Sequence, residues 1–114
     1  MEQSETNVLR QKQFEVSEKE TKVALLRTMI GDFDSMIGRL EEQITAEEDR
    51  TRIKDPRHPA YSMFAKAAAK RRQNLLISMA HTRSMFEVAK RELDQVTAQL
   101  HDLERTHDNQ LSAA

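Results

Sequence analysis

The fold of this chain is decided by its middle, the stretch Asp55-Pro56-Arg57-His58-Pro59. Proline lacks a backbone N–H and disfavours helical geometry in the residue before it, so a helix that reaches this stretch should stop near Lys54. Pro59 suits the first turn of a new helix, where the missing N–H is not needed. These are the only prolines in the chain. The sequence therefore predicts one sharp turn between two helices.

Both sides of this turn carry a heptad repeat. Before it, apolar residues recur every seven positions from Leu9 to Ile44, with a companion column from Lys12 to Glu47. After it, the two columns run from Ala65 to His107 and from Ala68 to Gln110. A period of about 3.5 residues gives a narrow apolar seam that fits one partner helix. Because the connection is short, we expect the two helices to be antiparallel neighbours.

The predicted fold is therefore all-α, with two long helices forming an antiparallel coiled-coil hairpin as a single domain over residues 1–114. We expect helix 1 at about 6–54, the turn at 55–59 and helix 2 at about 60–107, with a frayed tail to residue 114. The preferred register places Leu26 against Phe86, and a slip of one heptad is the alternative. Only the preferred register brings together two pairs of opposite charge, Lys22 with Glu92 and Glu20 with Lys90.

Composition excludes several classes of function. With 18 basic and 19 acidic residues, the net charge of −1 gives no bulk attraction to nucleic acid or to an anionic membrane. The absence of cysteine excludes disulfides and thiol chemistry and fits a reducing compartment. The N-terminus is polar, and the longest uncharged run, 73–82, is about half a membrane span. We expect a soluble cytoplasmic protein.

No residues are predicted to be catalytic, to bind a cofactor or to bind a metal. The sequence has no Gly-rich phosphate loop, and a two-helix hairpin offers no enclosed pocket in which a pKa could be shifted. His101, Glu104 and His107 share one helical face, but a carboxylate-bridged metal site needs such motifs from four helices. We interpret these three residues as solvated or seam-edge side chains. The chain is not expected to be an enzyme.

Basic residues are concentrated just after the turn. Between Arg57 and Arg91 there are eight of them against a single acid, Glu87. The favoured interpretation is that they complement the acidic end of helix 1, which carries Glu41, Glu42, Glu47, Glu48 and Asp49. An acidic protein partner is the second interpretation. Nucleic acid is the third and weakest, because no aromatic residues alternate with the charges.

Apolar residues also occur away from the seam. On helix 2 a stripe with helical spacing faces away from helix 1, and Leu76 flanks it: Met63, Ala67, Lys70, Asn74 and Ile77. On helix 1, Phe14 and Leu25 lie off the seam. Such residues gain nothing in water, so they indicate a docking surface, although single exposed apolar residues are common. Gly31 and Gly38, one heptad apart on the outer side of helix 1, are interpreted as tolerated surface glycines.

The segment from Ile53 to Leu75 resembles the turn and second-helix start of FliJ-type flagellar export proteins of alphaproteobacteria. The shared features are Asp55-Pro-x-His58-x-Ala60-Tyr61, followed by Phe64 and by Arg71-Arg72-Gln-Asn74-Leu75. The resemblance implies a stalk-like hairpin that binds the flagellar export ATPase, the cytoplasmic domain of the export gate and export chaperones, at the flagellar base on the inner membrane. It implies partner-binding roles for Tyr61, Phe64, Arg71, Arg72, Asn74 and Leu75.

The predicted function is therefore an accessory stalk and chaperone escort of the flagellar type III export apparatus, which acts by binding. The full predicted partner-binding set adds the helix 2 stripe: Tyr61, Met63, Phe64, Ala67, Lys70, Arg71, Arg72, Asn74, Leu75 and Ile77. Three of these, Tyr61, Arg72 and Leu75, also fall on seam columns. The alternative is a generic coiled-coil spacer or a homodimeric four-helix bundle with an unrelated partner.

Overall fold

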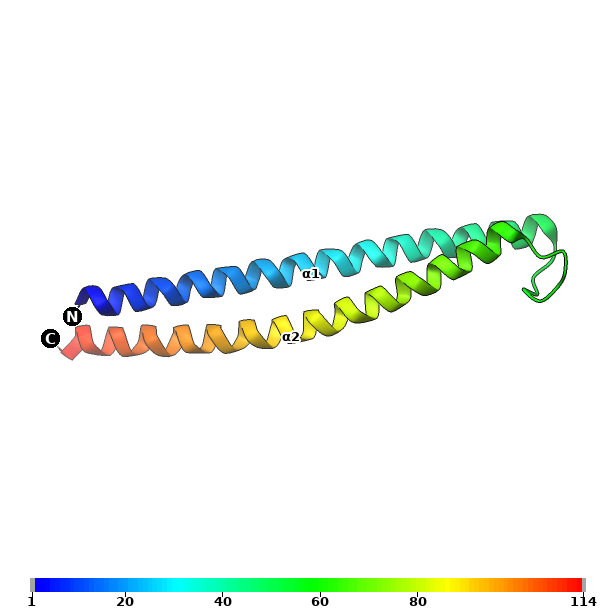
Figure 1. Cartoon of the computed structure of the whole chain (residues 1–114). Coiled ribbons are helices and arrows are strands. Elements are labelled where there is room, and N and C mark those ends of the chain that lie inside the picture. The colour runs from blue at the N-terminus through cyan, green and yellow to red at the C-terminus, as the bar shows by residue number, and fades with distance from the viewer. Residues whose placement is uncertain (1, 114) are drawn as a thin grey trace. The chain divides into compact units, whose positions relative to one another are not determined.

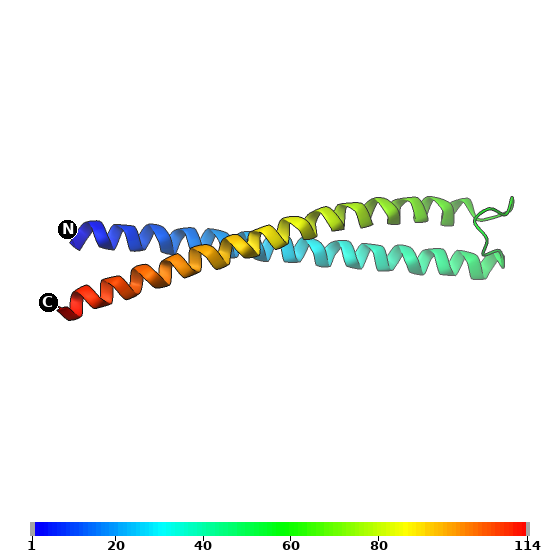
Figure 2. The ribbon, with the colours of Figure 1, turned by 90° about the horizontal axis from the view of Figure 1, so that it is seen from below.

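The computed structural model describes residues 2–113 and consists of two helices, α1 (Glu2–Thr51) and α2 (Met63–Ala113). The described residues form two compact units. The terminal unit contains α1 up to Arg27 and α2 from Ser84 onward, and the turn unit contains Thr28–Arg83. In each unit the segment of α1 lies beside an antiparallel segment of α2 (Figures 1 and 2). The predicted antiparallel coiled-coil hairpin is confirmed.

The predicted seam forms the interior of both units. Of the positions in the four heptad columns, every one is buried or half-buried except Gln110. The core of the terminal unit is Val23, Leu26 and Ala89, with Phe86 and Leu93 packed against it. Fully burying a side chain of the size of Val23 or Leu26 contributes about 1.5–3 kcal/mol to the free energy of folding. The buried seam residues of the turn unit are Ile37, Leu40, Tyr61, Ala65, Ala68, Met79 and Thr82.

Polar contacts between the helices agree with the preferred register. In the terminal unit, Lys19 Nζ lies 2.9 Å from Glu92 Oε2, and Phe86 packs against the cluster that contains Leu26. The finer charge pairing was right only in part. Lys22 is near enough to Glu92 to stabilise its charged form, as predicted. The direct ion pair, however, is made by Lys19, because the long lysine side chain of a seam position reaches outward to the flank. Lys90 pairs with Glu87 on its own helix at 3.3 Å.

The structure ends α1 three residues earlier than expected, at Thr51 rather than near Lys54. Arg52 has a φ of 60°, the left-handed conformation that commonly closes a helix. Its N–H still donates to the Glu48 carbonyl at 2.8 Å. The Thr51 hydroxyl donates to the Glu47 carbonyl at 2.9 Å. The helix therefore stops by its own C-terminal cap, before the proline can act on it.

The connection is correspondingly longer than the predicted 55–59. His58 N–H donates to the Asp55 carbonyl, and Tyr61 N–H donates to the His58 carbonyl, both at 3.0 Å. These bonds define two consecutive turns with Pro56 and Pro59 at their second positions, where the fixed φ of proline is favoured. Within them, Asp55 Oδ1 accepts from Arg57 N–H at 2.9 Å. Pro59 thus belongs to a turn and not to the first turn of α2.

The second helix begins at Met63 rather than at about residue 60, because Ser62 caps it. The Ser62 hydroxyl accepts from Ala65 N–H at 3.1 Å, the contact of an N-cap residue. At its other end α2 continues to Ala113, beyond the expected end at about 107. No proline or glycine interrupts the sequence after His107, so the helix has no local reason to stop there. Ala114, the last residue of the predicted tail, lies outside the described residues.

Candidate partner-binding face

Three of the residues predicted to bind a partner are engaged within the chain. Tyr61 is only 7% exposed, and its hydroxyl donates to Glu48 Oε2 at 2.8 Å. This hydrogen bond, followed by burial, raises the pKa of Tyr61. Arg72 Nε donates to Glu41 Oε1 at 3.0 Å. Leu75 is half-buried in the seam. These three residues therefore make contacts within the hairpin, as their positions on the seam columns indicate.

A polar network fixes the turn to the end of α1. Ser62 Oγ donates to Glu47 Oε1 at 3.0 Å, and Arg50 donates to both carboxylate oxygens of Glu47 at 2.8 and 3.0 Å. The hydrogen bond from Arg50 and then that from Ser62 lower the pKa of Glu47. Together with the Tyr61–Glu48 bond, these contacts fasten the connection between the helices to the end of α1.

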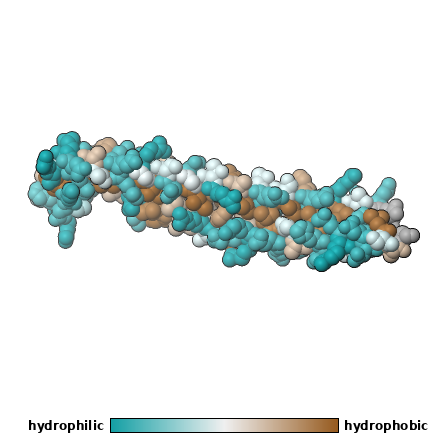
Figure 3. Space-filling model, turned by 180° about the vertical axis from the view of Figure 1, so that it is seen from behind, coloured by the Kyte–Doolittle hydropathy of each residue, from teal (hydrophilic) through white to brown (hydrophobic). Residues whose placement is uncertain are grey.

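The other seven predicted residues are exposed on one face of α2 in the turn unit. We call this set the outer face of α2: Met63, Phe64, Ala67, Lys70, Arg71, Asn74 and Ile77. Its large apolar members are 76% exposed at Met63, 57% at Phe64 and 60% at Ile77. Figure 3 shows how hydrophobic side chains reach the surface among hydrophilic ones on the side that it presents. A cluster of this kind on one helix face is typical of a docking surface.

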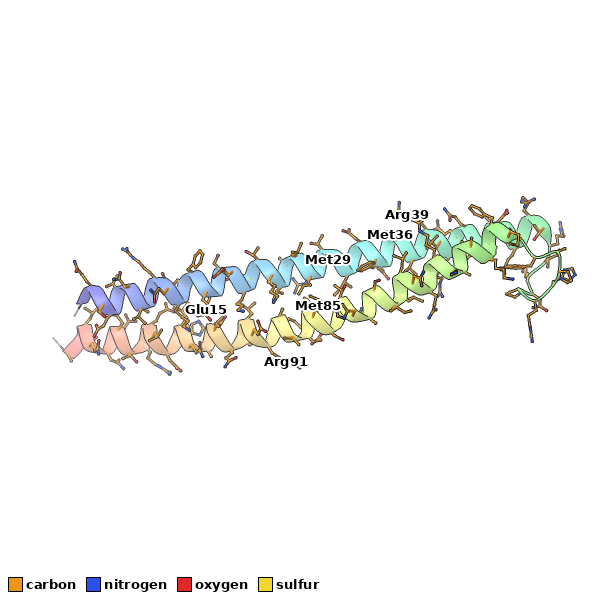
Figure 4. All side chains as sticks on the ribbon, in the orientation of Figure 1. Glu15, Met29, Met36, Arg39, Met85 and Arg91 are labelled. Atoms are coloured by element: carbon orange, nitrogen blue, oxygen red, sulfur yellow. The ribbon has the colours of Figure 1, made fainter. Side chains whose placement is uncertain are left out.

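Beside this face lies an open hollow of about 210 Å³ between the two helices of the turn unit. From α2 it is lined by Arg71 and Leu75, and from α1 by Met36, Arg39, Leu40 and Gln43. Figure 4 shows Met36 and Arg39 next to each other on α1. We call it the Arg39–Arg71 hollow. The α1 residues were missed at the sequence level, although the preferred register sets Gln43 close to Arg71.

The acidic end of α1 lies beside the basic start of α2 in the turn unit, as the favoured interpretation of these charges expects, but few of the charges are in direct contact. Only one ion pair joins the acidic end of α1 to the basic start of α2, the Arg72–Glu41 pair. The other acidic residues of α1 that form ion pairs in this unit do so with cations of α1 or of the turn. Glu47 pairs with Arg50, and Asp49 pairs with Lys54 at 4.0 Å. In the described part of the chain, four cations of α2 in this unit make no ion pair: Lys66, Lys70, Arg71 and Arg83. Basic charge is therefore left exposed on the outer face, at Lys70 and Arg71, and next to it.

The terminal unit has exposed apolar residues of its own. Phe14 is 67% exposed and Leu25 is 59% exposed, as expected for off-seam positions. A separate open hollow of about 250 Å³ is lined by Lys22, Ser84, Met85 and Val88. Figure 4 shows Glu15 on the side of α1 that faces α2 and Arg91 on the side of α2 that faces away from α1. These features are scattered, and they do not form a second face like that of α2.

The histidines of α2 do not gather ligands around a common point. His107 is half-buried with its Nδ1 3.9 Å from Glu5 Oε2, whereas His101 and Glu104 are exposed. Over residues 2–113, no group of three or more acidic or histidine side chains is placed to hold a metal ion. His58 is used by the turn, since its Nδ1 accepts from Ala60 N–H at 3.0 Å.

The class of protein that these observations define is a two-helix coiled-coil hairpin with an exposed apolar and basic face next to its turn. A comparison with protein families, curated proteins and solved structures finds no match for this chain. Over the described residues, neither α1 nor α2 contains a segment apolar enough to cross a lipid bilayer.

Proposed function

We propose that this chain is an accessory stalk and chaperone escort of a flagellar type III export apparatus, peripheral to the inner membrane at the flagellar base on its cytoplasmic side. Its partners would be the export ATPase, the cytoplasmic domain of the export gate and export chaperones, and it would act by binding. The observation that carries the proposal is the outer face of α2, with Met63, Phe64 and Ile77 exposed on a helical hairpin. The resemblance of residues 53–75 supplies the identity of the partners.

The paired helices suit a mechanical role. In the terminal unit a core of Val23, Leu26 and Ala89 holds α1 and α2 together, and in the turn unit Leu40 and Ala65 are among the buried seam residues. Two packed helices resist bending more than a single helix does. Such packing would keep the outer face of α2 rigid within the turn unit.

A second candidate is a structural spacer that forms a homodimeric four-helix bundle. The same exposed residues favour it, because Met63, Phe64 and Ile77 would be buried between two copies. Sedimentation in dilute solution separates the two functions. A species of 13.2 kDa with a high frictional ratio supports the free stalk, and a stable dimer supports the bundle.

The direct test of the stalk is co-purification with the export ATPase of the same organism. Ile77→Ala should lower retention, whereas Gln73→Ala, one turn earlier and also exposed, should leave it unchanged. Both variants should melt like the wild type, because neither side chain is buried. Equal retention of the two variants would remove the outer face from the binding site. Failure of the wild type to bind the ATPase, the gate domain and the chaperones would exclude the proposed function.

A further inference from the structure

The Arg39–Arg71 hollow combines charge with an apolar floor. Arg39 and Arg71 are exposed at its rim and make no ion pair within the described residues. Glu42, three residues along α1 from Arg39, does not approach it within the 4.0 Å of an ion pair. The floor contains Leu40, which is 7% exposed, and the half-buried Leu75. Two free guanidinium groups above apolar side chains are suited to a ligand that is itself part anionic and part apolar.

The charge balance indicates the sign of the ligand. Arg71 is one of four α2 cations in the turn unit without an ion pair. Guanidinium groups pair with carboxylates through two parallel hydrogen bonds, which gives such contacts both strength and orientation. Gln43 on the same rim can donate a further hydrogen bond from its amide.

The position of the hollow indicates the size of the ligand. Arg71 belongs both to the hollow and to the outer face of α2, since Ala67 precedes it by four residues and Phe64 by seven, on the same side of the helix. An occupant of the hollow is therefore in reach of the apolar residues of the outer face. A small ion would leave those residues exposed, whereas a helical segment of a partner would cover both.

We propose that the Arg39–Arg71 hollow binds a carboxylate side chain carried by an amphipathic segment of the partner protein, with an apolar side chain of that segment packed on Met36 and Leu75. The inference rests on the proposed function for the identity of that partner. A nucleic-acid ligand fits less well, because single strands are held by stacking on aromatic side chains, and Phe64 is the one exposed Phe, Tyr or Trp among the described residues of the turn unit.

The test is calorimetric titration of the full chain with the purified export ATPase and with the purified cytoplasmic domain of the export gate. Arg39→Gln and Arg71→Gln remove the charge and keep a polar side chain that can donate hydrogen bonds. The matched control is Arg83→Gln, which removes a charge from α2 outside the hollow, at a position that is also exposed and without an ion pair among the described residues. We expect each hollow variant to bind at least one of these proteins about tenfold more weakly or worse, and the control to bind within about twofold of the wild type.

A charge swap makes the test specific. Arg71→Glu should abolish binding, and one Asp→Lys or Glu→Lys change in the partner segment should restore it. If the wild type binds and both hollow variants bind equally well, the carboxylate site is excluded while the stalk function stands. If the wild type binds neither protein, the proposed function is excluded, and this inference with it. Binding of a DNA duplex that is lost in Arg71→Gln, with protein binding unchanged, would also overturn it.

Discussion

The hydroxyl of Tyr61 and the carboxylate of Glu48 form a 2.8 Å hydrogen bond that joins the residue before the cap of α2 to the last turn of α1. Tyr61→Phe keeps the ring in the seam and removes only this bond, so we expect a modest fall in the melting temperature measured by circular dichroism. The pKa of Tyr61 is raised above 10.0. The contribution of the Tyr61 hydroxyl to stability is therefore complete below pH 10.0. It is lost as the pH rises through the higher pKa that Tyr61 has in the folded chain.

The alkaline arm of the melting profile provides the check on Tyr61. Wild type should lose more stability than Tyr61→Phe above pH 10.0, because only the wild type has a phenol to ionise there. Parallel profiles for the two proteins would show that the hydrogen bond to Glu48 does not stabilise the hairpin.

Within the turn, His58 Nδ1 accepts a hydrogen bond from the Ala60 N–H at 3.0 Å. Asparagine places an acceptor at nearly the same distance from the backbone, and glutamine places it one bond too far. We expect His58→Asn to retain the wild-type stability and His58→Gln to lose about 0.5–1.5 kcal/mol, the net contribution of one neutral hydrogen bond. Chemical denaturation measures both. The reverse order would show that the imidazole acts through another contact.

The Lys19–Glu92 ion pair couples the helices of the terminal unit and makes their stability depend on acid. The hydrogen bond from Lys19 lowers the pKa of Glu92 below 4.5. The contribution of the charged Glu92 to stability is therefore present above pH 4.5. It is lost as the pH falls through the lower pKa that Glu92 has in the folded chain. Glu92→Gln should flatten the stability profile in this range, whereas Glu18→Gln, at an exposed position without an ion pair, should follow the wild type. The effect is small, because both partners are partly solvated.

Leu25 and Leu26 are neighbours in sequence and opposites in environment. Leu26 is 4% exposed in the core of the terminal unit, and Leu25 is 59% exposed. We expect Leu26→Ala to lower the free energy of unfolding by about 2–4 kcal/mol. Leu25→Ala should change it by less than about 0.5 kcal/mol. Similar losses for the two in urea denaturation would contradict the observed seam.

Gly31 and Gly38 offer a route to a more stable chain. A Cβ added to either would meet no atom within 4 Å, and neither has a positive φ. Gly31→Ala and Gly38→Ala should each raise the free energy of unfolding by about 1 kcal/mol, because alanine loses less backbone entropy in a helix. Partner binding should be unchanged, as expected for tolerated surface glycines. Loss of binding in a stabilised variant would instead indicate that a partner backbone approaches this side of α1.

The hairpin could be predicted from the sequence because its determinants are periodic and local. The columns through Val23 and Ala89 specify the seam, and two prolines in one short stretch specify a single reversal. The ends of the helices could not be predicted as well. They depend on the left-handed conformation of Arg52 and on the cap at Ser62, and neither residue type compels that role on its own.

The candidate binding face was predicted only in part, for a geometrical reason. A helical stripe identifies residues on one helix, so Met63 and Ile77 could be placed on a common exposed face. The hollow is made by two helices, and its α1 side, including Arg39, depends on how the flanks meet across the seam. Charge pairing was harder still, because Lys19 and Lys22 could each reach Glu92, and only side-chain geometry decides between them.

Within the terminal unit, the beginning of α1 lies beside the C-terminal part of α2: Glu5 Oε2 and His107 Nδ1 are 3.9 Å apart. A fluorophore attached to an exposed residue in the first turn of α1 would therefore lie close to one attached near His107 on α2. The same proximity makes the chain suitable for circular permutation, with a linker from the end of α2 to the start of α1 and a new opening at the exposed Arg57–His58 bond. Such a permutant would exchange the order of the helices while keeping every seam contact.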